Sequence, residues 1–347
     1  MSQPVAPTVA RPSRPGWLAL SIGVASVIVV GFAGLLLGAA GIDPWQVALA
    51  LLDALPFVEV ENTLTEIQSV VLYEIRAPRV VLGGIVGATL AVAGASYQGV
   101  FRNPLADPYL LGVAAGAGLG ATIAFSLSGE ANFLAPFAFI GGMTAVAVTY
   151  ALGRSVGGRT TTSLILAGVA VAAFATAIQT FLLQRNSETL RQVYSWILGQ
   201  LVTVGWGDVL GLLPYALVAS VVMLLSRRIL DVLSIGDEEA GALGVNVVRF
   251  RWTVVIAATL ATAAAVSVSG LIGFVGIIVP HTIRILFGAS YRVIIPLSLL
   301  FGASFLMAAD IAARTLVAPA ELPIGVVTAF FGAPFFVMVL RSMRRPN

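Results

Sequence analysis

The chain has 347 residues, of which 59% are hydrophobic and 10% are charged, with a formal net charge of +3 at pH 7. Because a soluble globular protein carries about 25% charged residues, this composition indicates a protein that lies mostly within a membrane. All 19 basic residues are arginine, and the sequence has no lysine, no cysteine and a single histidine, His281. These absences exclude a Walker A loop, a Schiff-base lysine, a thiolate nucleophile and a disulfide bond, and no His/Cys zinc site is expected.

Residues 1–16 are rich in proline and polar side chains, which predicts a disordered tail. One membrane domain fills residues 17–345. We expect about ten membrane-spanning helices, each close to the ~20 apolar residues that a span requires. They are 17–40, 79–101, 110–128, 134–153, 162–183, 207–226, 251–271, 272–288, 293–314 and 322–340. Residues 251–288 are almost continuously apolar, so the boundary near 271 is poorly defined, and nine or eleven spans stay possible.

The arginines are distributed unevenly between the two sides of the membrane. With the N-terminus inside, 14 arginines lie inside and five lie outside, at Arg76, Arg79, Arg185, Arg191 and Arg314. Loops rich in arginine stay in the cytoplasm, so both termini are predicted to be cytoplasmic, in the cytoplasmic (inner) membrane. Arginines in short loops indicate topology and lipid contact rather than a nucleic-acid partner.

Small residues are frequent within the predicted spans, and Gly83, Gly87 and Gly94 are examples from the second span. Small residues allow helices to approach closely in lipid, so we expect a dense bundle. The segment 88–91 (Ala-Thr-Leu-Ala) recurs at 258–261. Two five-helix halves would form an inverted repeat, as in many transporters, although chance similarity is the alternative in an alanine-rich chain.

Two loops are long enough to contact partners. The outer loop, residues 41–77, is acidic and is expected to include a short surface helix. The inner loop, residues 227–250, contains helix-forming stretches joined at Gly236. The acidic residues that follow, 237–239, suit a helix N-terminus, where the helix dipole favours negative charge.

Three motifs follow one another in order. The first begins Arg76-Ala77-Pro78-Arg79 and ends Arg102-Asn103-Pro104-Leu105-Ala106-Asp107-Pro108. The second runs from Gly270 through Pro280-His281 to Arg284, and the third joins Ala309-Asp310, Arg314, Glu321-Leu322-Pro323 and Gly332-Ala333-Pro334. Together they resemble the FecCD family, the permease subunits of binding-protein-dependent ABC importers for iron-siderophores, haem and vitamin B12. The resemblance covers about residues 70–340.

The resemblance implies a set of partners. A second permease copy, or a close homologue, would complete a central path. Two ABC ATPase subunits would bind on the cytoplasmic side and a substrate-binding protein on the outer side. The absence of a Walker A lysine agrees with this arrangement, because the chain then depends on a separate ATPase.

The outer arginines Arg76, Arg79 and Arg314 are cations that can pair with partner carboxylates, which arginine binds in a bidentate manner. The resemblance implies that they dock the binding protein, and the alternative is contact with lipid headgroups. The inner loop resembles the family's coupling helices, and a solvated acidic helix is the alternative. The candidate coupling residues are Ile235, Gly236, Asp237, Glu238, Glu239, Ala240, Leu243 and Gly244.

The resemblance also implies a cytoplasmic gate at Thr161 and Thr162, for which helix N-capping is the alternative role. Thr176, Gln179 and Thr180 are candidates for the translocation path, because polar residues in a span usually face protein or water. Threonine can instead bond to its own helix.

Other polar residues are predicted to be structural. We expect a hydrogen-bonding role for His281 rather than a metal-ligating one, and an i,i+4 ion pair between Asp310 and Arg314. Arg102, Asn103 and Asp107 are expected to hold an inner loop against a helix end.

The sequence therefore predicts an all-α permease subunit that imports an iron chelate by alternating access. It catalyses no covalent step and holds no cofactor or metal. Haem or vitamin B12 remains an alternative substrate. A stand-alone secondary transporter, with Asp310, Arg314 or His281 as the coupling site, is the alternative of another class.

Overall fold

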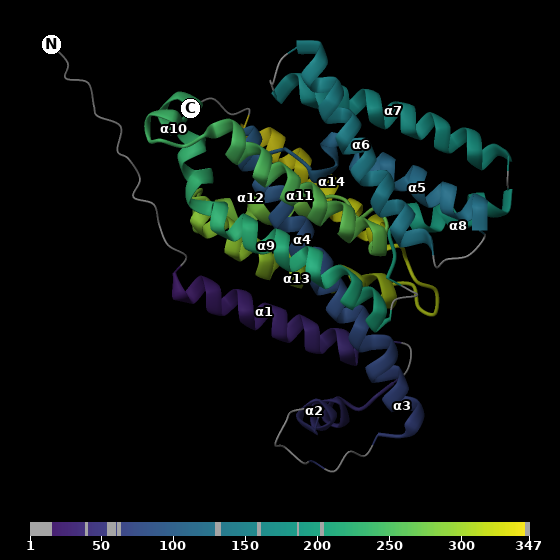
Figure 1. The fold of residues 1–347 in the computed structure, drawn as a ribbon. Helices are drawn as coiled ribbons and strands as arrows, with labels where there is room; N and C mark the ends of the chain where they lie inside the picture. The colour runs from purple at the N-terminus through teal and green to yellow at the C-terminus, as the bar shows by residue number, and fades with distance from the viewer. Residues whose placement is uncertain are drawn as a thin grey trace.

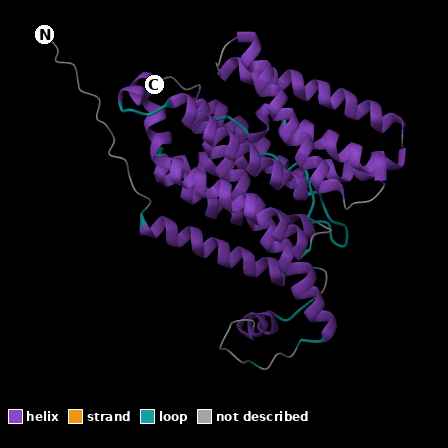
Figure 2. Cartoon of the chain, viewed as in Figure 1, coloured by secondary structure: helices purple, strands orange, loops and turns teal. Residues whose placement is uncertain are grey.

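The computed structural model describes residues 16–38, 41–53, 60, 64–128, 133–157, 161–185, 187–201 and 205–343, and this part contains helices and no strand (Figure 2). The predicted tail at 1–16 lies almost entirely outside the described residues. The elements are α1 (Trp17–Leu36), α2 (Pro44–Asp53), α3 (Glu66–Val70), the π-helix η1 (Val71–Arg76), α4 (Ala77–Phe101), the 3₁₀-helix η2 (Pro108–Leu111), α5 (Val113–Ser128), α6 (Leu134–Gly157), α7 (Thr161–Arg185), α8 (Ser187–Ile197), α9 (Trp206–Ile235), α10 (Asp237–Ala242), α11 (Val247–Ser269), α12 (Val275–Phe287), α13 (Tyr291–Thr315) and α14 (Ile324–Met343).

The predicted spans are confirmed within the described part of the chain. Seven helices are long and apolar enough to cross a membrane, and α5, α12 and α14 contribute three shorter apolar helices. Each of these ten helices coincides with one expected span. The surface helix expected in the outer loop is also present as α2, with α3 and η1 after it.

The α4 helix occupies the centre of the bundle. It packs against α9, α11, α12 and α13 (Figure 1), and glycines allow two of these contacts. A Cβ atom on Gly87 would lie 2.3 Å from the Gly302 carbonyl oxygen of α13, and one on Gly94 would lie 2.1 Å from the Gly276 carbonyl oxygen of α12. The dense packing predicted from small residues is therefore present around α4.

The boundary near residue 271 is a short non-helical segment. The α11 helix ends at Ser269, Gly270 has a φ of 68°, and α12 begins at Val275 after Phe274 with a φ of 69°. The break therefore lies at the boundary expected near residue 271. With 13 residues, α12 spans only ~20 Å, less than the ~30 Å of a hydrocarbon core.

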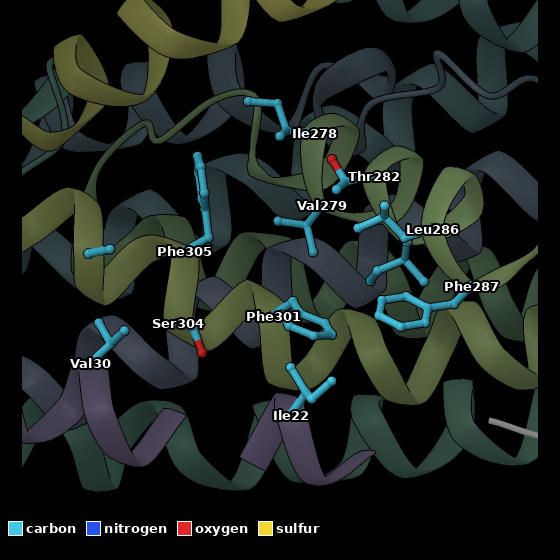
Figure 3. Close-up of a pocket in the computed structure, with 12 residues that line it drawn as sticks. Ile22, Val30, Ile278, Val279, Thr282, Leu286, Phe287, Phe301, Ser304 and Phe305 are labelled. Atoms are coloured by element: carbon cyan, nitrogen blue, oxygen red, sulfur yellow. The ribbon is translucent and has the colours of Figure 1, made fainter. Parts of the chain in front are cut away.

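The α1 helix packs on the outside of the bundle, against α13 and the end of α4. The Ser26 and Ser304 hydroxyls lie 2.8 Å apart across the α1–α13 contact. Beside it, α1, α12 and α13 border an apolar groove of about 460 Å³, lined mostly by aliphatic and aromatic side chains such as Ile22, Phe301 and Phe305 (Figure 3).

The bundle presents different elements at its two ends (Figure 1). One end of the bundle holds the start of α1, the end of α14 and the projecting helix α10. The other end holds α2, α3 and α8. The segments 88–91 and 258–261 lie in α4 and α11, which pack together through a 2.6 Å contact between the Tyr97 and Thr259 hydroxyls. The inverted repeat itself stays a prediction.

Candidate functional site

The candidate coupling segment forms a short helix that projects from the bundle. With 30 residues, α9 is ~45 Å long against a hydrocarbon core of ~30 Å, so its last turns carry α10 beyond the membrane. Gly236 joins the two helices, and Gly244, with a φ of 81°, turns the chain back toward α11. The candidate residues 235–244 are therefore brought together in one projecting element.

The surface of α10 combines apolar and acidic side chains. Ile235 is 67% exposed and Leu243 is 68% exposed, and Glu238 and Glu239 are also exposed. Ala240 is completely buried and anchors the helix to the bundle. Exposed aliphatic groups beside carboxylates, beyond the membrane, fit a protein partner with an apolar pocket and a polar rim.

The three candidate docking arginines converge at the opposite end of the bundle, where α1, η1, α4 and α13 meet. Arg76 donates to the carbonyl oxygens of Leu35 and Leu36 at 2.8 and 3.0 Å. Arg314 donates to those of Gly34 and Leu37 at 3.1 and 2.9 Å. Cations here satisfy the unpaired carbonyls at the C-terminus of α1 and complement its dipole.

Buried carboxylates hold the same arginines in place. The Asp310 carboxylate lies 2.9 Å from Arg79 and 3.0 Å from Arg314, which confirms the expected i,i+4 pair. Arg79 also donates to both oxygens of Glu321, at 3.2 and 2.9 Å. Sequence reasoning did not find the role of Glu321, which lies 242 positions from Arg79.

These arginines are largely buried in the permease chain. Arg76, Arg79 and Arg314 are 4%, 6% and 8% exposed. They nevertheless border a groove of about 260 Å³ that Gly38, Ala318 and Glu321 also line. A carboxylate that entered this groove would approach three guanidinium groups at once.

The candidate path residues of α7 differ in burial. Gln179 is buried against Gly118 of α5. A Cβ atom added to Gly118 would lie 3.1 Å from the Gln179 amide oxygen. Thr176 and Thr180 are exposed, and the Thr180 hydroxyl donates to the Thr176 carbonyl at 2.9 Å. The structure therefore brings the threonines together and separates them from Gln179.

The candidate gate lies at the start of α7, at the same end as α10 (Figure 1). Thr161 is the first residue of the helix, but its side chain lies outside the described part. Thr162 is exposed.

Most of the expected structural roles are visible. The Asn103 side chain accepts from the Leu105 amide at 2.9 Å, and the Asp107 side chain accepts from the Tyr109 amide at 2.7 Å. His281 differs from the expectation, because its buried Nδ1 has no hydrogen-bond partner among the described residues and its ring meets Phe335 edge-on. No cluster of metal-ligating side chains occurs in the residues that the structure describes.

Known proteins resemble this chain over most of its length. The FecCD transport family matches residues 26–342. The cobalamin import system permease protein BtuC of Halobacterium salinarum is 42% identical over 300 residues, which cover 86% of this chain and 80% of that protein. The hemin transport system permease protein HmuU of Yersinia pestis is 40% identical over 279 residues, covering 78% of this chain and 83% of HmuU.

A solved structure shares the fold. It is an inward-facing conformation of a transporter assigned to the metal-chelate type of ABC transporter. The match has a TM-score of 0.81 and 28% identity, and it covers 94% of this chain and 99% of that chain. The chain therefore belongs to the FecCD transport family and is a multi-pass permease of the ABC-transporter class in the cytoplasmic membrane.

Proposed function

We propose that this chain is the membrane subunit of an importer that carries an iron chelate into the cytoplasm by alternating access. Two separate ATPase subunits hydrolyse ATP, and an extracytoplasmic binding protein delivers the substrate. The observation that carries the proposal is α10, a helix that projects from the bundle with aliphatic and acidic side chains exposed. The chain has no lysine for a Walker A loop of its own.

The α10 segment is the proposed contact with the ATPase. Ile235 and Leu243 would enter an apolar cleft, while Glu238 and Glu239 would meet its polar rim. A short helix with a buried anchor at Ala240 moves as a rigid unit, so a displacement imposed by the ATPase would be transmitted to α9 and α11. With α10 on the cytoplasmic side, both ends of the chain are cytoplasmic too, in agreement with the arginine distribution.

The arginine groove is the proposed docking site for the binding protein. Glu321 is the exposed member of the cluster, with 36% of its side chain accessible, and it occupies the bidentate position on Arg79. A carboxylate of the binding protein would replace Glu321 there. Glu321→Gln should therefore tighten docking of the binding protein, measured by surface plasmon resonance on the permease in nanodiscs. Weakened docking would contradict the exchange.

The exposed faces of α7 suit a path shared with a second permease copy or a close homologue. Ala173, Thr176 and Thr180 form a stripe of small and hydroxyl side chains at helical spacing, and Leu166, Phe174 and Phe181 form an adjacent apolar stripe. Hydroxyl groups favour a water-filled path over lipid. Gln179, buried against α5, would support the helix. Thr161 and Thr162, at the start of α7, would form the gate.

Cobalamin is the second candidate substrate, because the matched cobalamin permease is 42% identical to this chain. Both candidates are bulky chelates for which walls of small side chains leave room. Affinity would reside mainly in the binding protein, so the path need only hold its cargo weakly.

Vesicle uptake tests the function and the substrate together. The permease would be reconstituted with its genomically neighbouring ATPase and binding protein, and ferric siderophore, haem and cobalamin would be offered in parallel. ATP-dependent uptake of a ferric chelate that requires the binding protein is expected. If cobalamin alone were taken up, cobalamin rather than an iron chelate would be the substrate. Uptake that follows a proton gradient without ATP would contradict the ABC mechanism and favour a secondary transporter.

The charge arrangement argues against the secondary transporter. Its candidate coupling carboxylate, Asp310, is held between Arg79 and Arg314 and is only 2% exposed. A proton- or ion-coupling group must instead exchange its ligand during each cycle.

A further inference from the structure

The carboxylate of Asp237 joins α10 to two helices of the bundle. Its Oδ1 atom lies 3.2 Å from Nη2 of Arg102 and 3.0 Å from Nη2 of Arg251. Arg251 also approaches Oδ2 at 3.1 Å. These are the ion pairs that α10 makes with the rest of the described chain. The contact with Arg102 spans 135 sequence positions (237 − 102), so only the fold brings these residues together.

Both arginines lie at the ends of the most deeply buried helices. Arg102 is the C-terminal cap of α4, with a left-handed φ of 49°. Its amide bonds to the Gly99 carbonyl at 3.4 Å, and the following Asn103 amide bonds to Gln98 at 3.1 Å. Arg251 lies in the second turn of α11. Because these helix ends are fixed, a displacement of Asp237, which is paired with both arginines, would move each helix as a whole.

The other side chains of α10 provide no equivalent link. Ile235 and Leu243 are exposed at its two ends, Glu238 and Glu239 face outward, and Ala240 has only a methyl group to pack. The chain itself connects α10 to α9 and α11, but α4 is not its neighbour in sequence. Asp237 is thus the side-chain connection from α10 to the central helix of the bundle.

We propose that Asp237 is a positioning residue of the transport cycle, which transmits displacement of α10 to α4 through Arg102 and to α11 through Arg251. This role rests on the proposed contact between α10 and the ATPase. The Asp237 side chain is 41% exposed, and those of Arg102 and Arg251 are 45% and 20% exposed. A docked ATPase that covered them would strengthen both pairs, because buried pairs are screened less than exposed ones.

The test measures substrate uptake and ATP hydrolysis in the same reconstituted complex of permease, ATPase and binding protein. Asp237→Asn removes both pairs, while Arg102→Asn removes one and keeps a residue that tolerates the left-handed backbone. A pair of this exposure changes an equilibrium by up to about fivefold. We therefore expect Arg102→Asn to lower uptake per ATP hydrolysed about twofold to fivefold, and Asp237→Asn to lower it further. In both variants ATP hydrolysis should fall by less than uptake does.

Matched variants separate transmission from folding. Asp237→Glu and Arg102→Lys keep the charges and should retain coupling. Arg249→Ala removes an exposed cation two residues before Arg251 on the same helix and should also retain it. Unchanged uptake per ATP in Asp237→Asn would overturn the proposal. A parallel fall of uptake and ATP hydrolysis would do the same, because it would indicate a defect in assembly.

The cysteine-free sequence permits a second test. Cysteines introduced together as Arg102→Cys and Asp237→Cys would be joined in the assembled complex by a short bis-methanethiosulfonate, which forms a disulfide with each cysteine, so that a reductant reverses the link. Before cross-linking, this variant lacks both ion pairs of Asp237 and should show lowered uptake per ATP, as Asp237→Asn does. The cross-link rejoins α4 to α10, so it should raise uptake per ATP, and reduction should lower it again. A cross-linked complex with no higher uptake per ATP than the reduced one would overturn the proposal. The proposed function itself would be refuted if the wild-type complex hydrolysed ATP but showed no ATP-dependent uptake.

Discussion

The substitution Asp310→Asn tests how the buried charges at the outer end of the bundle are balanced. The Asp310 side chain is 2% exposed, and its partners Arg79 and Arg314 are 8% and 6% exposed. Asparagine keeps the shape of the side chain but removes the counter-ion that the two guanidinium groups share. Breaking a buried ion pair costs about 3–5 kcal/mol. Because the amide still accepts one hydrogen bond, we expect a loss of about 3 kcal/mol in the free energy of unfolding.

A loss of this size should lower the thermal midpoint by about 4 °C, since an unfolding entropy of about 2.1 cal/mol/K per residue amounts to about 0.7 kcal/mol/K for a chain of 347 residues. The midpoint would be followed by tryptophan fluorescence of the purified permease in detergent, at one heating rate because unfolding of large proteins is often irreversible. Glu321→Gln is the matched control. It also removes a carboxylate from Arg79, but its side chain is 36% exposed, and a solvated pair contributes about 0–1 kcal/mol.

The double variant Asp310→Asn/Arg314→Gln adds a second comparison. It removes one of the two cations that Asp310→Asn leaves without their counter-ion, so its midpoint should fall by less than the sum of the two single effects. Equal midpoints for Asp310→Asn and Glu321→Gln would refute the reasoning. They would mean that the two arginines are already solvated.

Three further predictions concern packing, coupling and pH. Gly94→Ala should lower the thermal midpoint by several degrees, because its Cβ would lie 2.1 Å from a backbone oxygen of α12, whereas Gly241→Ala, with open space around its Cβ, should not. Glu238→Arg should abolish uptake in reconstituted vesicles while ATP hydrolysis continues, and normal uptake would count against α10 as the coupling element. Burial raises the pKa of the Asp107 carboxyl to about 6. The folded state then binds this proton more tightly than the unfolded chain, so its stabilising contribution is present at low pH and is lost as pH rises from about 4 to about 6. Asp107→Asn should remove that part of the pH dependence of the thermal midpoint, and an unchanged difference between pH 4 and pH 6 would show that another group causes it.

The sequence predicted the membrane helices well because each lies in a continuous apolar run. It placed their ends less well. The α9 helix continues to Ile235 rather than ending near 226, and the α3–η1–α4 helix begins at Glu66 rather than near 79. In both cases the extra turns lie beyond the apolar core, where hydropathy no longer reports on helix length. The break before α12 depends on a left-handed Phe274, a conformation for which a bulky side chain gives no sequence signal.

The sequence identified which residues of the candidate site are charged or polar, but it did not identify which of them contact one another. The pair between Asp310 and Arg314 follows from helical spacing, and the structure confirms it. The pairs of Arg79 with Glu321 and of Arg102 with Asp237 join distant positions, so no local pattern indicates them. Likewise, residues 176, 179 and 180 are close in sequence, but a helix places Gln179 about 100° from its neighbour Thr180. The structure accordingly buries the amide and exposes the threonines.

The burial of the outer arginines changes how docking must be understood. Cations that were free on a rim would attract a partner carboxylate over the distance set by salt screening, about 8–10 Å. Here each arginine already has partners, namely carbonyl oxygens of α1 or the carboxylates of Asp310 and Glu321. The binding free energy of a docking carboxylate is therefore only the difference between its own interaction with the arginine and the interaction that it replaces. If it displaces Glu321, it removes one side-chain contact that holds the segment 316–323, which links α13 to α14. Docking at the outer end and the position of α14 would then be coupled through a single exchanged carboxylate.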